Sequence, residues 1–267
     1  FDCDLPEPVA HAVARGTACV FTSKCPGATG PNEDAAAVVS IANGSGVLLV
    51  ADGMGGGNNG EAASMRAISE VEAAVSVLAT SPEDELIRSA ILNGIENANE
   101  SVRSELNGAG TTVAAVEIVN GAIRPYHVGD SMILVVGGRG KIKHQTIAHS
   151  PTGYAVEAGF IEEHDAIHHE DRHLVSNYVG SPTMHIAIGP TISLALRDTV
   201  VVASDGLGDN VHVHEIAEHL RKGPLDKSLQ RIVALARSRM DSPESGSPSK
   251  PDDLTVVAFR LNRSAKS

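Results

Sequence analysis

Four apolar runs in this chain each adjoin an acidic residue. Asp52 follows the run at 47–51, Asp130 ends the segment 125–130, Asp205 follows 200–204, and Asp252 precedes the run at 254–258. An apolar run that meets an acid and a glycine is typical of a buried strand that holds a carboxylate at a sheet edge, because glycine lets the backbone turn sharply and approach a ligand. One such corner is an ordinary turn. Four of them predict carboxylates that converge on a hard cation, since oxygen ligands suit Mg²⁺, Mn²⁺ or Ca²⁺.

The composition is that of an ordinary globular protein of 267 residues, with 42% hydrophobic and 20% charged residues. This length suffices for one large domain or two small ones. Acidic residues outnumber Lys and Arg by 33 to 21, and the net charge of −12 argues against a nucleic-acid partner. Bound metal would neutralise part of this charge. No apolar run approaches the roughly 18 residues of a membrane span, so we expect no membrane partner.

The three cysteines, Cys3, Cys19 and Cys25, all lie near the start of the sequence and form no CxxC pair. An odd and sparse set favours a reducing compartment and predicts a cytoplasmic protein, with a Cys19–Cys25 bridge as the alternative. The sequence begins with Phe1 and shows no secretory segment. We therefore expect a trimmed chain or an excised domain.

The order of predicted elements is strands, two long helices, strands, then two helices and a last strand. Apolar residues recur at helical spacing in 63–78 and 87–102, with Ser81-Pro82 as a helix start and Gly108 as a stop. Two shorter helices are predicted at 213–220 and 225–240. Strands are predicted at 13–21, 35–41, 46–51, 111–119, 122–127, 132–136, 141–146, 191–196, 199–204 and 254–261, the pair 191–196 and 199–204 forming a hairpin. This order favours antiparallel sheets covered by helix pairs over alternating βαβ units.

The acidic residues belong to five ordered motifs: Asn32-Glu33-Asp34, Asp52-Gly53-Met54-Gly55-Gly56, Gly129-Asp130-Ser131, Ser204-Asp205-Gly206-Leu207-Gly208-Asp209 and Pro251-Asp252-Asp253-Leu254-Thr255. Their order and spacing resemble the metal-dependent protein serine/threonine phosphatases (the type 2C, or PPM, family), and the bacterial members in particular. The resemblance runs from about residue 13 to residue 261. Gly110-Thr111-Thr112 and the segment 172–180 fit the same pattern. A single Asp-Gly pair would be weak support, but five motifs in order are specific.

The resemblance implies a single phosphatase domain over residues 1–267. Its fold would be α+β, a four-layer α-β-β-α sandwich of two antiparallel sheets flanked by helix pairs. Residues 1–12 would be an N-terminal extension and 241–250 a plain Ser/Pro-rich loop. The irregular, histidine-rich segment 147–185 would be a flap that borders the active site and helps to select protein substrates.

The resemblance also implies a centre of two Mn²⁺ or Mg²⁺ ions between the sheets. Asp52 would bridge both ions, and the Gly53 carbonyl would ligate one of them. Asp205 and Asp252 would complete the first site.

Four more acids would serve the remaining positions of this centre. Glu33 and Asp34 would hold the second ion, directly or through ordered water. Asp130 and Asp209 match the positions that bind an optional third, weaker ion in many bacterial members.

The chemistry accounts for these residue types. Two divalent ions about 3.5–4 Å apart lower the pKa of a bridging water enough to give hydroxide near neutral pH. That hydroxide would attack phosphorus in line while the ions neutralise the phosphoryl oxygens. We therefore expect hydrolysis of phosphoserine and phosphothreonine in phosphorylated protein substrates, in signal transduction. Asp52, Asp205 and Asp252 would be catalytic through the metal-activated water.

Four positions depart from the family's pattern. Thr29 stands where an arginine usually clamps the substrate phosphate, so we expect weak affinity for small phosphate esters or compensation from elsewhere. Met54 stands where many eukaryotic members carry a histidine proposed as general acid, and a thioether cannot donate that proton. Met132 and Asp253 replace a common arginine and asparagine, and we expect them to alter local packing and hydrogen bonding.

Three alternatives stay open from the sequence. Thr29 motivates a non-catalytic or weakly active regulator that binds a protein partner through the same surface. A phosphatase dedicated to one anti-sigma-type regulator differs from the main hypothesis only in its substrate. The flap histidines His164, His168, His169 and His173 could hold zinc, but their spacing matches no closed zinc site. His212, His214 and His219 are expected on a helix face, and the oligomeric state is open.

Overall fold

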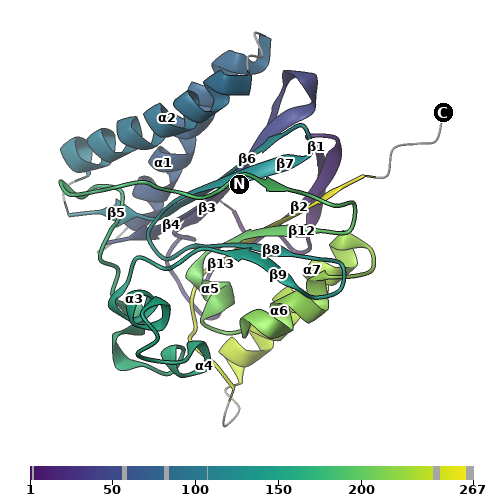
Figure 1. Ribbon diagram of the computed structural model, residues 1–267. Coiled ribbons are helices and arrows are strands. Elements are labelled where there is room, and N and C mark those ends of the chain that lie inside the picture. Colours follow the sequence, from purple (N-terminus) through teal and green to yellow (C-terminus); the bar gives the residue numbers. More distant parts are fainter. Residues whose placement is uncertain (2, 56–58, 81–83, 107, 243–246, 263–267) are drawn as a thin grey trace.

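The computed structural model describes residues 1, 3–55, 59–80, 84–106, 108–242 and 247–262. The chain forms two antiparallel sheets that pack face to face between two pairs of helices (Figure 1). The first sheet has the strand order β1 (Val9–Val13), β2 (Gly16–Ser23), β13 (Leu254–Leu261), β12 (Thr199–Ala203), β8 (Met132–Val136) and β9 (Ile142–Gln145). The second has the order β10 (Ala187–Ile188), β7 (Ala122–Val128), β6 (Val113–Val119), β4 (Ser45–Met54) and β3 (Asp34–Ile41), with β11 (Ile192–Ser193) on β7 and β5 (Gly110–Thr111) on β4.

Helices cover the outer face of each sheet. The long helices α1 (Asn59–Ser76) and α2 (Asp84–Glu105) pack on the second sheet, and α6 (Val213–Leu220) and α7 (Leu225–Asp241) pack on the first (Figure 1). The shorter helices are α3 (Pro151–Glu157), α4 (Glu163–Ala166) and α5 (Asp205–Gly208), with 3-10 turns at Ala42–Gly44, Val77–Thr80 and Glu170–His173. The expected four-layer α-β-β-α sandwich is therefore confirmed.

Burial on both faces explains why the central strands are apolar without alternation. In β4, Val47 and Leu49 pack under the helices α1 and α2, while Leu48 and Val50 point into the layer between the sheets. β12 and β13 divide their side chains in the same way between the sheet–sheet layer and the helices α6 and α7. Three apolar layers thus hold the strand ends that carry the acidic residues in fixed positions.

The structure corrects several boundaries. Residues 9–12, expected in an N-terminal extension, form most of β1, and the strand expected at 13–21 is a hairpin that turns at Ala14 and Arg15, both with positive φ. The hairpin expected from 191–196 and 199–204 is wrong. β11 pairs with β7 in the second sheet, whereas β12, whose side chains are all buried, lies in the middle of the first.

Three smaller expectations also have outcomes. The segment 147–185, expected to be irregular, contains α3 and α4. Cys19 and Cys25 are free thiols, so they form no bridge. The helix start expected at Ser81-Pro82 lies outside the described residues. Among the helices that the structure describes, none has the length and apolarity needed to cross a membrane.

The glycines that follow two of the acids are required by close backbone contacts. A Cβ atom on Gly206 would lie 1.9 Å from the carbonyl oxygen of Asp253, and one on Gly53 would lie 2.1 Å from that of Gly60. Neither carbonyl is a flexible side chain that could move aside. The Asp-Gly corners therefore let neighbouring backbone pack directly against the ends of the strands.

Replacement of Gly206 by alanine tests this close contact. We expect Gly206→Ala to lower the free energy of unfolding by about 2–3 kcal/mol, since overpacking against backbone forces a shift of the main chain. Urea denaturation measures the change. Gly30→Ala is the matched control, because no atom lies within 4 Å of the added methyl group. Equal stabilities for the two variants would contradict the argument.

An ion pair joins α6 to α7. Arg239 donates from Nη1 to Oε2 of Glu215 and from Nη2 to Oε1, both at 2.8 Å. These hydrogen bonds outweigh the opposing effect of burial and lower the pKa of Glu215 to about 2. Because this pKa lies below its unfolded value of about 4.3, the pair stabilises the fold above that value and loses its effect as the pH falls toward 2.

Glu215→Gln should therefore cost stability in a pH-dependent way. We expect a loss of about 1.5–3 kcal/mol at pH 7, shrinking as the pH falls below about 4.3. Urea denaturation between pH 7 and pH 3 measures the difference from the parent. The control is Glu218→Gln, which removes a carboxylate that is 61% exposed and should change stability little. A difference that stays constant with pH would refute the assignment.

Candidate active site

The acids predicted from the sequence meet at one end of the sandwich. Asp34 begins β3 and lies directly opposite Asp52 of β4 in the strand register. Asp205 follows β12, and Asp252 precedes β13, so the first sheet supplies these two. Burial and the nearby charges of Asp205, Asp34, Asp130 and Asp252 raise the pKa of Asp52 well above its usual range. Carboxylates from both sheets therefore converge, as the motifs predicted.

The backbone of Asp52 is held by two threonines, Thr111 at the end of β5 and Thr112 just after it. Its N–H donates to Thr112 Oγ1 at 3.0 Å. Its carbonyl accepts from Thr111 Oγ1 and from the Thr112 N–H, each at 2.8 Å. The following N–H, of Gly53, donates to the carbonyl of Glu33 at 3.0 Å. These bonds fix the direction in which the Asp52 side chain leaves the strand.

Asp34 is held by the opposite sheet. Ser204, which is fully buried after β12, donates from Oγ to Asp34 Oδ2 at 2.6 Å and accepts the N–H of Thr255 at 3.0 Å. The N–H of Asp34 donates to Asn32 Oδ1 at 3.0 Å. Asp34 Oδ1 is buried and receives no hydrogen bond within the described part of the chain. An unpaired buried carboxylate oxygen is a position that a cation would satisfy.

Glu33 lies at the border of this cluster. Burial and the charges of Asp253 and Asp252 raise its pKa. Its carboxyl group is next to Gly60 at the start of α1. A Cβ atom added to Gly60 would lie 2.7 Å from this carboxyl group. Asp253 holds the loop before Glu33: its Oδ2 accepts the Glu33 N–H at 2.5 Å and its Oδ1 accepts the Cys25 N–H at 2.6 Å. The expectation that Asp253 acts in local hydrogen bonding is confirmed.

Lys250 enters the cluster from a segment that the sequence predicted to be a plain loop. Its Nζ lies 2.7 Å from Asp205 Oδ2 and 2.9 Å from Oδ2 of both Asp209 and Asp252. Burial opposes the charge on this amine, but the three carboxylates outweigh it and raise the pKa of Lys250 far above its ordinary value. Residues 247–250 form no helix or strand, as expected for a loop at 241–250, but the contact of Lys250 with the acids was not part of that expectation.

The turn that carries Asp130 is held by a buried histidine that the sequence did not single out. The backbone N–H of Gly129 donates to the ring nitrogen Nδ1 of His149 at 3.1 Å. The backbone N–H of His149 donates in turn to the carbonyl of Gly129 at 3.0 Å. Asn177 bonds to the same ring nitrogen at 2.8 Å. Burial and the charge of Asp205 raise the pKa of Asp130 to about 7. Burial and the same charge also raise the pKa of Asp209.

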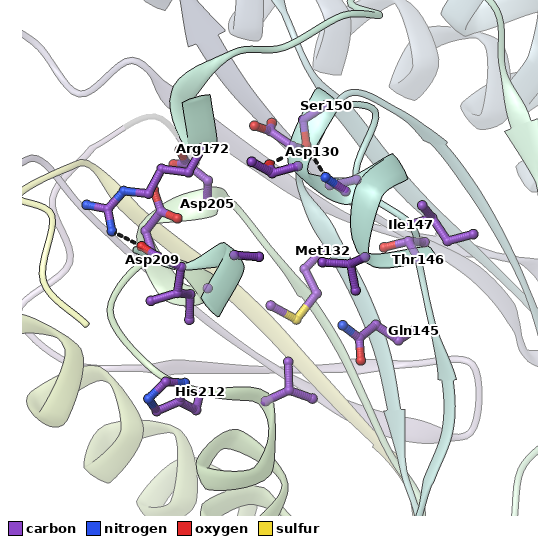
Figure 2. A pocket seen from close by; sticks show the side chains of 18 of the residues that line it. Asp130, Met132, Gln145, Thr146, Ile147, Ser150, Arg172, Asp205, Asp209 and His212 are labelled. Atoms are coloured by element: carbon purple, nitrogen blue, oxygen red, sulfur yellow. Dashed lines mark hydrogen bonds between the residues drawn. The ribbon is translucent and has the colours of Figure 1, made fainter. Parts of the chain in front are cut away.

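A cavity of about 510 Å³ opens beside the carboxylates, under α3 and α4. Asp130, Asp205 and Asp209 line one end of it (Figure 2). Its remaining wall combines apolar side chains with polar and charged ones: Met132, Ile142, Ile147, Val156, Ile167 and Val213 on the one hand, and Gln145, Glu157, His164, Arg172, His212 and His214 on the other. The cavity thus joins an end with three aspartates to a chamber of mixed polarity, and residues between 147 and 172 form part of its wall.

Thr29, Met54 and Met132, which depart from the family pattern, differ in where they lie in the fold. Thr29 is exposed in the loop between β2 and β3. Met54 ends β4, opposite Gly110 of β5. Met132 lines the cavity and packs against the α6–α7 layer, which confirms the packing role expected for it. Of the flap histidines, His164 lies beside Asp165 and His169 beside Asp171.

The donor set suits a hard divalent cation, because it consists of carboxylates and the backbone carbonyl of Gly53 near the end of β4. As they stand, no three Asp, Glu, His or Cys side chains among the described residues are grouped in a way that would hold one ion. Three of the aspartates instead surround the Lys250 amine. The ligand roles of individual residues therefore stay predictions, although the chemistry of the set fits.

Known proteins resemble this chain over most of its length. The family model for protein phosphatase 2C matches residues 26–239. A putative protein phosphatase 2C-type of Streptococcus pyogenes is 29% identical over 202 residues, which cover 72% of this chain and 80% of that protein.

Solved structures of phosphatases show the same fold. The serine/threonine phosphatase of S. agalactiae has a TM-score of 0.78 at 28% identity, covering 92% of this chain and 99% of that one. The catalytic domain of the phosphatase PstP in complex with two manganese ions has a TM-score of 0.72 at 23% identity, covering 92% of this chain and 98% of that one. With the family model matching most of its length, the chain belongs to the protein phosphatase 2C family and is a protein serine/threonine phosphatase.

Proposed function

We propose that this phosphatase hydrolyses phosphoserine and phosphothreonine in proteins at the aspartate cluster, with two Mn²⁺ or Mg²⁺ ions held between the sheets. One observation carries the proposal. Carboxylates from the strand ends of both sheets lie close enough together for four of them to raise the pKa of Asp52. Such crowding of like charges is costly unless cations offset it. The family membership and the manganese in the PstP structure support the same chemistry.

The ligand assignment follows the motifs. The Asp52 carboxylate and the Gly53 carbonyl would help to hold the ions. Asp205 and Asp252 would complete the first site.

Asp34 and Glu33 would serve the second ion, directly or through water. The buried, unpaired Oδ1 of Asp34 supports its part in this assignment. Glu33, at the border of the cluster, suits contact through a water better than direct contact.

When bound, two such ions supply an activated water and neutralise the phosphoryl oxygens. The residues of the chain position them. Thr111 and Thr112 fix Asp52, and Ser204 fixes Asp34 from the opposite sheet. The side chain of Met54 cannot donate a proton to the leaving group, so water or another residue must do so. Asp130 and Asp209, which the resemblance assigns to an optional third ion, lie on the cavity side of the cluster.

The cavity indicates what the substrate presents beside its phosphate. The apolar part of its wall suits an apolar side chain next to the phosphorylated residue, while Asp130, Asp205 and Asp209 would disfavour an acidic one. Thr29 offers no cation to the phosphate, so affinity would depend on such protein contacts more than on the phosphoester. We further propose one phosphatase domain with a flap at 147–185, acting in cytoplasmic signal transduction.

Hydrolysis of a phosphothreonine peptide tests the proposal. We expect activity in Mn²⁺ or Mg²⁺, loss of activity in chelator, and recovery when metal is added back. Asp52→Asn should lower kcat by about 10³-fold or more, because it removes a charge that holds both ions. Phosphate release is the measurement.

Asp241→Asn is the matched control, since it removes an exposed aspartate at the end of α7. It should retain the parent's activity. Activity that survives chelation, or an Asp52→Asn variant as active as the parent, would overturn the proposal.

A further inference from the structure

The ammonium group of Lys250 lies among carboxylates that the proposed function assigns to metal ions. Its nitrogen is within 2.9 Å of one oxygen from each of Asp205, Asp209 and Asp252. In each case the oxygen is Oδ2, and Asp252 uses Oδ1 to accept the N–H of Asp253 at 3.0 Å. The amine donates a hydrogen bond to Asp205 Oδ2 and forms ion pairs with Asp209 and Asp252, although Asp209 Oδ2 accepts no hydrogen bond within the described part of the chain.

The backbone of Lys250 is held in place by the fold. Its N–H donates to Asn210 Oδ1 and its carbonyl accepts from Asn210 Nδ2, both at 2.8 Å. Asn210 is fully buried and also donates to the carbonyl of Gly206, inside α5. Arg172 of the flap segment donates to the carbonyl of Ser249 at 3.2 Å. The backbone of Lys250 is therefore fixed relative to α5, the helix that begins at Asp205 and ends just before Asp209.

The negative charge of the cluster exceeds the positive charge of two divalent ions, so the amine can balance part of the excess. Six aspartates surround the centre: Asp34, Asp52, Asp130, Asp205, Asp209 and Asp252. Two divalent ions would offset most of their charge, and the ammonium offsets a further part where Asp209 lies. Asp209 is also a residue that the resemblance assigns to an optional third ion. A lysine paired with it supplies a positive charge there without any ion.

We propose that Lys250 is a built-in cation beside Asp209 that excludes a third divalent ion and limits this chain to two, its contacts with Asp205 and Asp252 giving way when the first ion binds. The inference rests on the proposed function, because it concerns the same aspartates. It deepens that function by assigning a role to a residue outside the acidic motifs. A divalent ion at Asp209 would have to displace an ammonium group whose backbone is held nearby by Asn210, which costs the ion pairs of that amine.

Counting bound manganese tests the inference without relying on activity. Equilibrium dialysis against millimolar Mn²⁺, followed by elemental analysis, gives the number of ions per chain. We expect about two for the parent and about three for Lys250→Met, which keeps an unbranched side chain but removes its terminal amine and charge. Lys250→Gln is a second uncharged variant with the same expectation. Lys250→Arg, which keeps a cation, and Lys227→Met, which removes an exposed lysine on α7, should both stay near two.

A second readout is thermal unfolding in chelator. The uncharged variants should melt below the parent, because three carboxylates lose their counter-ion, and Mn²⁺ should restore more of their stability than it gives the parent. Equal ion counts in the parent and Lys250→Met, or three ions in the parent, would overturn the inference. If the parent binds no Mn²⁺ and works in chelator, the proposed function fails as well. If the parent binds two ions and needs them, but Lys250→Met also binds two, only this inference fails.

Discussion

The rest of this structure depends on bringing several carboxylates into one small volume. Each ionised carboxylate that leaves water costs free energy, and each neighbour of the same charge adds to that cost. Asp34 and Asp52 are forced together because they are opposite one another in the β3–β4 register. Hydrogen bonds from Ser204 and the ammonium of Lys250 offset part of the repulsion. In the function that we propose, two divalent ions would offset the remainder of this charge.

The apolar layers supply the stabilisation that offsets the repulsion between the crowded carboxylates. Strands buried on both faces, such as β4 and β12, fix the acids at their ends against repulsion that would otherwise push them apart. The glycines beside them let backbone from other segments pack against the corner, which leaves the carboxylates little freedom to separate. The ion pair of Glu215 with Arg239 extends this support, since Arg239 also donates to the carbonyl of Asn210. The helix layer and the Lys250 segment are thus connected.

Much of the fold and of the site could be predicted from the sequence, because both depend on local patterns. Continuous apolar runs gave the central strands, and the order of the acidic motifs gave the residues that converge. The errors came from features that no local pattern carries. β11 and β12 adjoin in sequence and are both strand-like, but their partners lie in different sheets. Residues 9–12 were expected to be an extension, because no local pattern shows that they pair with β2.

The supporting residues were missed for a similar reason. Lys250 lies in a polar stretch that looks like solvent-exposed loop, and its backbone is held beside the acids by Asn210, forty positions earlier in the chain. His149 holds the turn of Asp130, nineteen positions earlier in the chain. It lies in a segment with many histidines, and the sequence does not show that this one is buried. Residues that position a site act through tertiary contacts, so a motif reveals the ligands more readily than their supports.

Anomalous diffraction at the manganese edge, from crystals of the unmodified protein soaked in Mn²⁺, shows directly whether the aspartate cluster holds two ions. We expect two manganese peaks between the sheets, both within coordination distance of Asp52, with the Lys250 amine still beside Asp209. An anomalous map without a peak at Asp52, or with manganese only at the flap histidines, would contradict this expectation.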